Sequence, residues 1–561
     1  MAAPATTSPP TRAGTLERLA RAARDELDLL VIGGGATGAG IARDAALRGL
    51  AVALVEAGDF ASQTSSQSSR LVHGGLRYLQ YGDLRLVFEG LRERRNLMTM
   101  APHLCRPVEF LFPGYAGESP GLFTEGLGIK LYNALALWRS PASSRRLAAR
   151  EVYEAAPFLR SAGLLGAQAY VDCQTDDARL VLENVLDAER AGAAVLSHAP
   201  VTSLLHDERG RLRGAHVAPD GAGAPIDLYA RVVVNATGPF SDTFDRGRQN
   251  LRPTLGVHII VDAARLPHGG RVVVLRSPRD NRLFFVLPAG PRTVVGTTDT
   301  DWAPPGSADA SAAPRLGDVI RARGADVAYL LEALNHAYPP ARLGAEDVLA
   351  TTAGLRPLVA TTAHTPSQTS REHELLREPD GLLTIVGGKL TTLRSMGEQV
   401  VDAVVEILAD KGREAPVGPC VTATRPLPGG GALPAPSAML SVLPDDVLAH
   451  LLATYGTLAD DVLAPTVDAP ALATRLDPEL PYLWAEVVYA IHAEHAREVA
   501  DVLARRVPLF RQARDQGLGV APLVAASLGE LLGWTAARRQ QSLDVYAAAV
   551  ESSRAWRHDP I

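Results

Sequence analysis

A glycine-rich turn between an apolar strand and a helix is the feature that most restricts what this chain can fold into. A short apolar run leads into Gly33, Gly35 and Gly38, which have the spacing G-x-G-x-x-G. The first glycine permits a tight turn, the second lets the backbone approach a pyrophosphate, and the third lets helix and strand pack closely. A second apolar run ends at Glu56, where an acid can bind ribose hydroxyls. The pattern predicts a dinucleotide-binding βαβ unit and fits NAD and FAD equally.

The composition is that of a globular chain with room for several domains. Hydrophobic residues make up 47% of its 561 residues and charged residues 21%, which excludes a disordered or fibrous class. The net charge of −6, without a basic stripe, argues against nucleic acid as a partner. Because no run of eighteen apolar residues occurs, we predict no transmembrane helix.

Cysteine usage and the N-terminal residues indicate a reducing compartment. Cys105, Cys173 and Cys420 lie far apart without a C-x-x-C pair, which argues against a disulfide framework and against an iron–sulfur or zinc site. Residues 1–25 lack the apolar core of a signal peptide and are predicted to form a flexible arm. We therefore expect a cytoplasmic protein.

A run of hydroxyl and amide side chains follows the second apolar strand. It is either a solvated surface loop or a strip of hydrogen-bond donors along a cofactor. The two glycines that come next would let the backbone lie close to a flat ring, with His73 and Arg77 on either side. The second interpretation assigns to the cofactor Thr64, Ser65, Ser68, Ser69, His73, Gly74 and Gly75.

Several sequence blocks resemble the FAD-dependent glycerol-3-phosphate dehydrogenases. The most specific is Ser-Ser-Arg-Leu-Val-His-Gly-Gly-Leu-Arg-Tyr-Leu at 68–79. Further blocks match that family in the same order at 170–172, 176–181, 234–239, 296–299, 354–358 and 387–392. The resemblance covers roughly residues 28–411, with a weaker similarity in the C-terminal part.

The resemblance implies FAD as cofactor and an enzyme of the aerobic, quinone-linked type. Such an enzyme oxidises sn-glycerol 3-phosphate to dihydroxyacetone phosphate by moving a hydride from C2 to flavin N5, and its electrons pass to a quinone. It also implies a Rossmann-like FAD-binding domain, so the expected fold class is α/β. An antiparallel substrate domain is inserted in that fold, and a helical C-terminal domain follows.

The resemblance also places the residues that would handle the substrate. A dianionic phosphate needs cations, and the family positions correspond to Arg77, Tyr78, Arg356, Arg371 and Lys389. Arg356 and Lys389 are also expected to act in catalysis. His258 is the expected base, because histidine titrates near neutrality, and its alternative interpretation is a core histidine on a strand.

The sequence around His258 departs from the family pattern. Relatives usually carry Lys-Gly-Ser-His there, whereas this chain has Leu255 and Val257 in place of the lysine and the serine. We expect the wall of the substrate site to lose a positive charge.

Two further glycine turns are expected beside the cofactor. A buried strand from Arg231 ends in a turn that places Ala236 and Gly238 near it. Gly387, Gly388 and Lys389 open a helix predicted from Leu390 to Ala409, so Leu390 and Thr391 belong to the same junction. The free N–H groups and dipole of that helix could stabilise negative charge on a reduced flavin.

Periodicity divides the chain into parts. Short β-rich runs without helices between them, from 257 to 296, indicate an inserted antiparallel sheet. The predicted organisation is an arm at 1–25, an FAD-binding domain at 26–105, 160–254 and 350–411, a substrate domain at 106–159 and 255–349, a linker at 412–436, and a helical domain at 437–561.

No metal site is predicted. His492, Glu494 and His495 lack the H-E-x-x-H order, and a solvated helix face explains them better. Two other functions stay open: an oxygen-using glycerol-3-phosphate oxidase of the same family, and a catalytically silent flavin-binding module. An amine-oxidising enzyme is disfavoured because the expected cations suit a phosphate.

The segment 122–138 is apolar and aromatic, with arginines just after it. It is too short to span a membrane. It is either an amphipathic segment lying in the membrane interface or a buried helix, and the sequence favours neither. The first interpretation would place the protein on the inner face of the cell membrane, close to a quinone acceptor. A homodimer is also left open.

Overall fold

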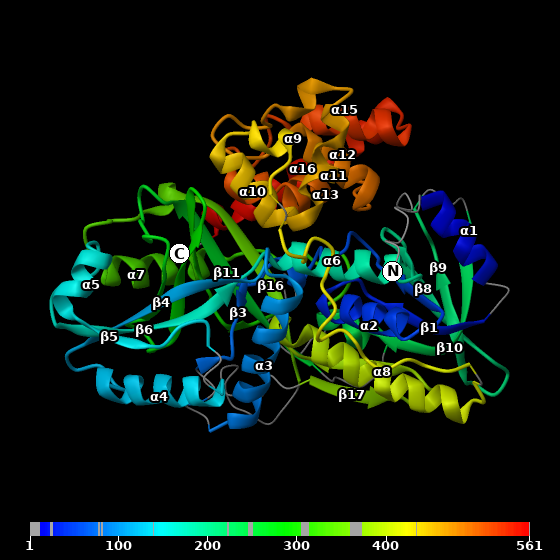
Figure 1. The fold of residues 1–561 in the computed structure, drawn as a ribbon, viewed down its shortest axis with the longest axis horizontal. Helices are drawn as coiled ribbons and strands as arrows, with labels where there is room; N and C mark the ends of the chain where they lie inside the picture. The colour runs from blue at the N-terminus through cyan, green and yellow to red at the C-terminus, as the bar shows by residue number, and fades with distance from the viewer. Residues whose placement is uncertain are drawn as a thin grey trace.

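The computed structural model describes residues 12–22, 26–76, 79, 82–137, 140–220, 224–244, 251–303, 314–359, 373–413, 415–433 and 435–559. Two sheets lie side by side, and a helical part, yellow to red in Figure 1, lies against both of them. This is the α/β class with an additional helical domain that the sequence predicted.

The first sheet has eight strands, and its central strands are parallel. Along its main path run β17 (His373–Arg377), β18 (Leu383–Gly387), β10 (Ile226–Asn235), β1 (Leu27–Ile32), β2 (Val52–Val55) and β7 (Ala194–Leu196). Two further strands, β8 (Val201–His206) and β9 (Leu212–Val217), extend from β10.

Both faces of this sheet are covered, as its continuous apolar runs require. Alternate residues of β1 point to opposite sides. Leu29 and Val31 pack against helices, and Leu30 and Ile32 pack against β8 and β9. The helices on the first face are α2 (Ala36–Leu47), α6 (Asp177–Arg190) and α8 (Leu393–Asp410). The predicted helix at 390–409 is therefore present, and its first turn is a 3₁₀ turn, η6 (Leu390–Thr392).

The N-terminal residues differ from the predicted flexible arm. Residues 12–22 form helix α1 (Arg12–Ala22), and its Leu19 is buried against the first sheet. Arg12 donates a hydrogen bond of 2.8 Å to the carbonyl oxygen of Ser197. The apolar spacing of Leu16 and Leu19 gives this helix a face to bury, which the composition of the arm did not reveal.

The second sheet has ten strands and is largely antiparallel. It contains β15 (Thr300–Asp301), β11 (Leu251–Asp262), β14 (Arg292–Gly296), β13 (Leu283–Ala289), β12 (Val272–Arg276), β4 (Arg106–Tyr115), β6 (Leu164–Gln174), β3 (Leu71–Val72), β16 (Val348–Val359) and β5 (Arg145–Ala148). One face packs against α7 (Gly324–Ala337) and α5 (Ala149–Ala155), and the other carries Phe110, Phe112 and Tyr170.

The sheet assignment of some strands departs from the predicted boundaries. β6 was expected in the FAD-binding domain, but it pairs with β4 from Arg106 to Tyr115 and so belongs to the second sheet. β16 likewise pairs with β11 along almost its whole length. Long antiparallel partners determine these positions, and such pairing between distant segments leaves no local pattern in the sequence.

Helix α4 (Leu122–Leu135) lies on the side of the molecule away from the helical part (Figure 1). Helix α3 (Leu84–Met100) contacts it. Within the described residues, no helix combines the length and the apolar character needed to cross a bilayer.

The C-terminal part is helical, as predicted, and is not loosely tethered. The preceding residues, predicted as a linker, pack against the first sheet's domain: Leu427 is buried, and its N–H donates to the carbonyl oxygen of Met100 at 2.9 Å. The helices are α9 (Ala438–Ser441), α10 (Asp445–Tyr455), α11 (Ala459–Leu463), α12 (Trp484–Ala493), α13 (Val499–Asp501), α14 (Leu509–Gln512), α15 (Ala521–Leu532) and α16 (Ala536–Arg554).

Candidate active site

A cavity of about 460 Å³ lies between the two sheets. It brings together most of the residues predicted for the site, although they come from seven separate stretches of the chain. The predicted residues that line it are Gly33, Gly35, Glu56, Thr64, Ser65, Ser68, Ser69, His73, Gly75, Ala236, Gly238, His258, Arg356, Gly387, Gly388, Lys389, Leu390 and Thr391.

The glycine turn after β1 is built for close backbone contact. Gly33 has a φ of +109°, and a Cβ there would lie 2.6 Å from the carbonyl oxygen of Ala236. Gly38 does not line the cavity. A Cβ on Gly38 would lie 1.8 Å from the carbonyl oxygen of Gly33, so this glycine lets α2 pack onto the turn. The N-terminus of α2 thereby points at the cavity, as anion binding requires.

Glu56 lines the cavity at the end of β2 and also holds the glycine turn. Its Oε2 accepts a hydrogen bond from the Gly34 N–H at 2.6 Å, and its Oε1 accepts one from the Gly58 N–H at 2.8 Å. Burial raises the pKa of Glu56, and these backbone hydrogen bonds oppose that rise. The carboxylate therefore connects the expected ribose position to the backbone of the turn.

The hydroxyl run lines the cavity, but several of its hydroxyls bond within the protein. The Thr64 hydroxyl donates to the carbonyl oxygen of Leu355 at 2.7 Å, and the Ser65 Oγ accepts from the Ala36 N–H at 2.9 Å. The Ser68 hydroxyl donates to Asp177 at 2.8 Å. The loop is thus fixed to β16, α2 and α6, and it is more rigid than a solvated surface loop.

The acid pair at the start of α6 has two separate roles. Asp176 is the N-cap residue of α6, and its side chain accepts a hydrogen bond from the Arg179 N–H at 2.9 Å. Asp177 also accepts from the Ser68 N–H at 3.0 Å. It therefore ties the hydroxyl loop to the helix.

The two later glycine segments meet beside the cavity. The His73 N–H donates to the Thr391 hydroxyl at 3.4 Å. Gly388 has a φ of +91°, and a Cβ there would collide with Met396. Gly74 was predicted to face a flat ring, but a Cβ on it would collide with Leu91 instead. Gly74 therefore lets α3 pack closely, and the predicted contact of this glycine with the cofactor stays a prediction.

His258 lies on β11 and is 2% exposed. Its Nε2 is 2.9 Å from the Ser69 hydroxyl, and its Nδ1 is 3.4 Å from the Thr352 hydroxyl. Burial lowers the pKa of His258 to about 3, with further lowering by the charges of Arg356, Arg511 and Arg70. The imidazole is therefore neutral near pH 7, with one ring nitrogen available as a proton acceptor.

Arg356 lies on β16, which is the neighbour of β11. Its guanidinium donates to Asp299 at 3.1 Å and to the Thr297 hydroxyl at 2.9 Å. It covers Gly256, where a Cβ would lie 2.5 Å from an Arg356 nitrogen. The absence of a side chain at Gly256 therefore leaves room for the guanidinium, and the Asp299 carboxylate fixes the orientation of the guanidinium at the cavity wall.

The expected loss of charge near His258 is not found in the cavity wall. Leu255 and Val257 point to the other face of β11 and pack in the core of the second sheet, whereas Gly256 and His258 line the cavity. Side chains alternate along a strand, so a residue at 255 or 257 does not face the cavity. This prediction was wrong because it counted residues without following the alternation.

Three predicted substrate residues, Arg77, Tyr78 and Arg371, lie outside the described residues. Conversely, the structure adds residues that sequence reasoning missed. Arg282 lines the cavity and donates to the carbonyl oxygen of Asp299 at 2.7 Å. Aromatic side chains of the second sheet also line it, among them Phe110 and Phe112, and their alternate spacing on one strand was a readable signal.

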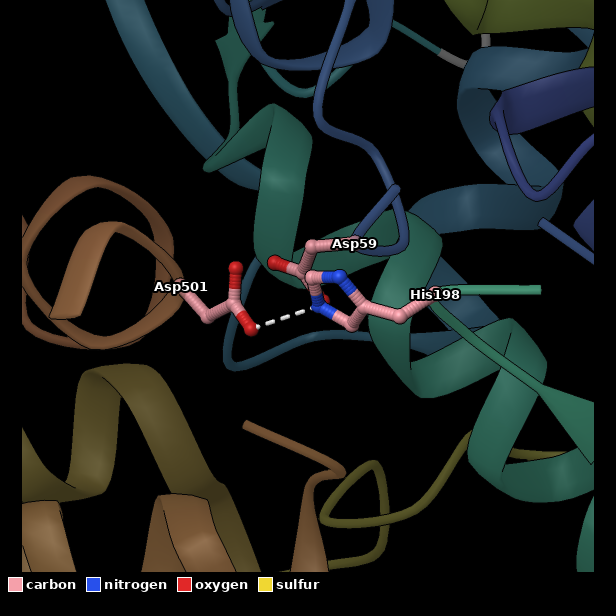
Figure 2. Close-up of side chains that lie close together, drawn as sticks. All are labelled: Asp59, His198 and Asp501. Carbon is pink, nitrogen blue, oxygen red and sulfur yellow. Dashed lines mark hydrogen bonds and ion pairs between the residues drawn. The ribbon is translucent and has the colours of Figure 1, made fainter. Parts of the chain in front are cut away.

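A cluster of possible metal ligands lies apart from the cavity lining. Figure 2 shows Asp59, His198 and Asp501, with His198 Nε2 at 2.9 Å from an Asp501 oxygen. The carboxylate of Asp59 also pairs with Arg505 and Arg506. Two arginines against two carboxylates already balance the charge, so the chemistry of this cluster is that of an ion network.

Comparison with known proteins assigns the family. The sequence model of the FAD dependent oxidoreductases matches residues 28–402, and that of the C-terminal domain of alpha-glycerophosphate oxidase matches residues 420–539. The glycerol-3-phosphate dehydrogenase of Synechocystis is 35% identical, covering 94% of this chain and 96% of the relative. The mitochondrial glycerol-3-phosphate dehydrogenase of Arabidopsis thaliana is 36% identical, covering 96% and 88%.

A solved structure agrees over nearly the full length. The glycerol-3-phosphate dehydrogenase of Bacillus halodurans, crystallised with FAD, has a TM-score of 0.77 and 30% identity, covering 98% of both chains. The glycine turns in this chain, where a Cβ would meet backbone, form a cradle that fits FAD. The chain therefore belongs to the FAD-dependent glycerol-3-phosphate dehydrogenase family, with FAD as its cofactor.

Proposed function

We propose that this enzyme oxidises sn-glycerol 3-phosphate to dihydroxyacetone phosphate and passes the electrons to a quinone. The observation that carries the proposal is the grouping of His258, Arg356 and Lys389 on the wall of one cavity that the FAD cradle also lines. The relatives named above are glycerol-3-phosphate dehydrogenases, which fixes the substrate class.

Each of the three side chains has a task in this reaction. The cationic Arg356 and Lys389 attract the dianionic phosphate, and Asp299 holds the Arg356 fork in a fixed direction. His258 accepts the proton of the C2 hydroxyl. FAD, when bound, supplies the acceptor for the hydride that leaves C2.

The low pKa of His258 is compatible with this role once substrate charge is considered. Arg356, Arg511 and Arg70 all disfavour a protonated imidazole in the free enzyme. A phosphate dianion beside Arg356 offsets part of that positive field and makes the imidazole a better base. We propose that the base is therefore strengthened by the substrate it serves.

The proposal is tested by turnover of purified enzyme on glycerol 3-phosphate with a quinone analogue, a dye and oxygen as alternative acceptors. We expect turnover with the quinone analogue and the dye to exceed turnover with oxygen. Glycerol and dihydroxyacetone phosphate serve as controls for the need for phosphate and for the direction of reaction. An enzyme that carries FAD but leaves glycerol 3-phosphate unchanged would be the silent flavin-binding module instead.

An oxygen-using oxidase is the second candidate, because the helical part matches the C-terminal domain of alpha-glycerophosphate oxidase. The same assay separates the two. Stoichiometric hydrogen peroxide at a rate equal to the quinone-linked rate would favour the oxidase.

We also propose that the enzyme lies on a membrane through helices α3 and α4. Six apolar side chains of these helices and the turn after α4 are exposed, and we call them the apolar face: Leu84, Phe88, Phe123, Leu127, Leu131 and Leu137. Phe123 is 81% exposed, which is costly in water unless another phase covers it. The buried residues of α4 include Ile129 and Tyr132, so the helix combines the two alternatives of the sequence: one side is buried and the other exposed.

Flotation with liposomes tests this proposal. Phe123→Glu with Leu127→Glu should abolish flotation with anionic vesicles, because two charges would have to enter the interface. The matched control is Leu523→Glu, which changes an exposed leucine (58% exposed) of the helical domain. Parent protein that stays wholly in the soluble fraction would exclude the apolar face as a membrane contact.

A further inference from the structure

The helical C-terminal domain grips the loop that carries the hydroxyl run. A π-helical turn, Val502–Arg506, presents Arg505 and Arg506 on consecutive positions, and both pair with Asp59. Arg506 also donates a hydrogen bond of 2.9 Å from its Nη2 to Asp59 Oδ1. All three side chains are largely or fully buried, so this pairing is protected from screening by salt.

A second contact from the same domain lies further along the loop. Arg511, on α14, donates to the carbonyl oxygen of Ser66 and, at 3.5 Å, to the side-chain oxygen of Gln67. Ser65, Gln67 and Ser69 line the cavity, whereas Ser66 is buried behind them. Arg511 therefore supports the loop from the side opposite the cavity.

The charge of Arg511 is unusual for a buried arginine. The side chain is 6% exposed, and among the ion pairs of the described residues none involves it. Its Nε is buried without a hydrogen-bond partner within the part of the chain that the structure describes. Burial and the charge of Arg70 lower the pKa of Arg511 to about 10, which leaves it charged near neutral pH. Asp177 and Asp176 offset this lowering only in part. A buried cation without a carboxylate in direct contact is costly, so we expect a function that outweighs the cost.

We propose that Arg511 is a positioning residue of the oxidation site, contributed by the C-terminal domain: it holds Ser66 and Gln67 so that Ser69 stays against His258. The loop is short, and Ser69 lies only three residues after the carbonyl that Arg511 holds. The inference rests on the proposed role of His258 as the base. It adds that the helical domain is part of the reaction machinery and not only a cover.

The charges around His258 give this proposal a readout that a merely structural role lacks. Arg356 faces His258 from β16, Arg70 from the loop and Arg511 from α14. The guanidinium of Arg70 forms ion pairs with Asp176 (Nη1 to Oδ2, 3.6 Å) and with Asp177 (Nε to Oδ1, 3.5 Å). Removing the Arg511 charge raises the pKa of His258, so the neutral base is lost at a higher pH than in the parent. The same change removes a positive charge from behind the loop that lines the cavity, which would disfavour a reduced, anionic flavin bound there.

The test compares Arg511→Gln, Arg511→Lys and the control Arg475→Gln. The control removes an arginine of the same domain whose ion pair with Asp446 is on the surface. Each enzyme is loaded with FAD, and we measure the rate of FAD reduction by glycerol 3-phosphate in single turnover, its pH dependence, the flavin midpoint potential and the unfolding temperature.

We expect Arg511→Gln to slow FAD reduction roughly tenfold, the scale of a small misplacement of a reacting group. As pH is lowered, the rate of FAD reduction by Arg511→Gln should begin to fall at a higher pH than that of the parent. The midpoint potential of its flavin should be more negative. Arg511→Lys, which keeps the charge, should restore the pH profile and the potential and recover only part of the rate. Arg475→Gln should match the parent in all of these.

Other outcomes overturn the inference. Arg511→Gln with a lower unfolding temperature but the parent's pH profile and potential would show a purely structural role. If Arg511→Gln does not retain FAD, Arg511→Lys decides: a shifted pH profile despite the retained charge contradicts the proposal. A parent enzyme that does not oxidise glycerol 3-phosphate refutes the proposed function, and the midpoint potential of Arg511→Gln then still tests the effect of the charge on the flavin.

Discussion

The two ends of the cavity are built by different means. At the nucleotide end, the wall is mostly backbone: the turn at Gly33 lies on Ala236, and Glu56 accepts a hydrogen bond from the Gly34 N–H of that turn. At the oxidation end the wall is made of charged and titratable side chains from separate strands, chiefly His258 and Arg356. One end depends on the absence of side chains and the other on their presence.

This difference predicts how each end responds to mutation. Where a wall is backbone, an added carbon atom cannot be accommodated, because the atoms it meets are backbone atoms that no side-chain rotation can move. Where a wall is side chain, a truncation leaves the fold intact and removes one chemical task. Binding of FAD and the rate of its reduction should therefore be separable by mutation.

The largest effect is expected at Gly38. Gly38→Ala places a Cβ 1.8 Å from the carbonyl oxygen of Gly33, so α2 must move away from the turn. We expect the purified variant to contain no FAD, as read from its absorbance at flavin wavelengths. The control is Gly128→Ala, where a Cβ meets open space on α4, and this variant should retain FAD fully. A purified Gly38→Ala enzyme that still contains FAD would show that the glycine turn can shift to accommodate the added Cβ.

The next largest effect is expected at His258. His258→Ala should reduce the rate of FAD reduction by glycerol 3-phosphate at least a hundredfold, which is the usual contribution of general base catalysis. FAD content should be unchanged, since the glycine turns are untouched. His336→Ala removes an exposed histidine of α7 and should match the parent. FAD reduction at the parent's rate in His258→Ala would assign proton removal to another group or to water.

A smaller effect is expected at Arg356. Arg356→Ala should raise KM by roughly ten- to a hundredfold, because a charged hydrogen bond to the phosphate is lost in ground and transition states alike. A lesser fall in kcat follows from poorer alignment of C2. Arg252→Ala is the control, as this arginine pairs with Asp301 away from the cavity lining. An unchanged KM would show that Arg356 does not bind the phosphate and would assign phosphate binding to Lys389.

The same contrast explains how much of the molecule could be read from the sequence. The nucleotide end is formed largely by one contiguous stretch of the chain, and its backbone geometry requires a characteristic spacing of glycines. Gly33, Gly35 and Glu56 could therefore be identified from the sequence pattern alone. His258 carries no such trace. A single histidine on a strand is compatible with a core residue, and only the resemblance to a family gave it a role.

Other features had no signal that a reader of the sequence could use. Arg511 lies on a four-residue helix in a different domain, and its contact with Ser66 spans 445 positions. The pairing of β4 with β6 likewise joins distant segments. By contrast, the placement of Leu255 and Val257 in the core was readable from strand alternation around His258.

The smallest expected effect concerns the pH dependence of stability, and there too the two ends differ in sign. Burial raises the pKa of Glu56, so the contribution of this group to stability is complete below its unfolded pKa and is lost as pH rises through the folded value. Burial lowers the pKa of His258 to about 3, so its contribution is complete above the unfolded pKa near 6.5 and is lost as pH falls toward 3.

Between about pH 8 and pH 5, the unfolding free energy should fall by roughly 2 kcal/mol because of His258. In this range the histidine becomes protonated in the unfolded chain but stays neutral in the folded protein. Denaturant unfolding of the parent and of His258→Gln at both pH values isolates this group, since every other titration is shared. The variant should lose less stability on acidification by about that amount. Equal losses in the two proteins would mean that the folded His258 is protonated readily, so that burial and the charges of Arg356, Arg511 and Arg70 together lower its pKa less than the geometry implies.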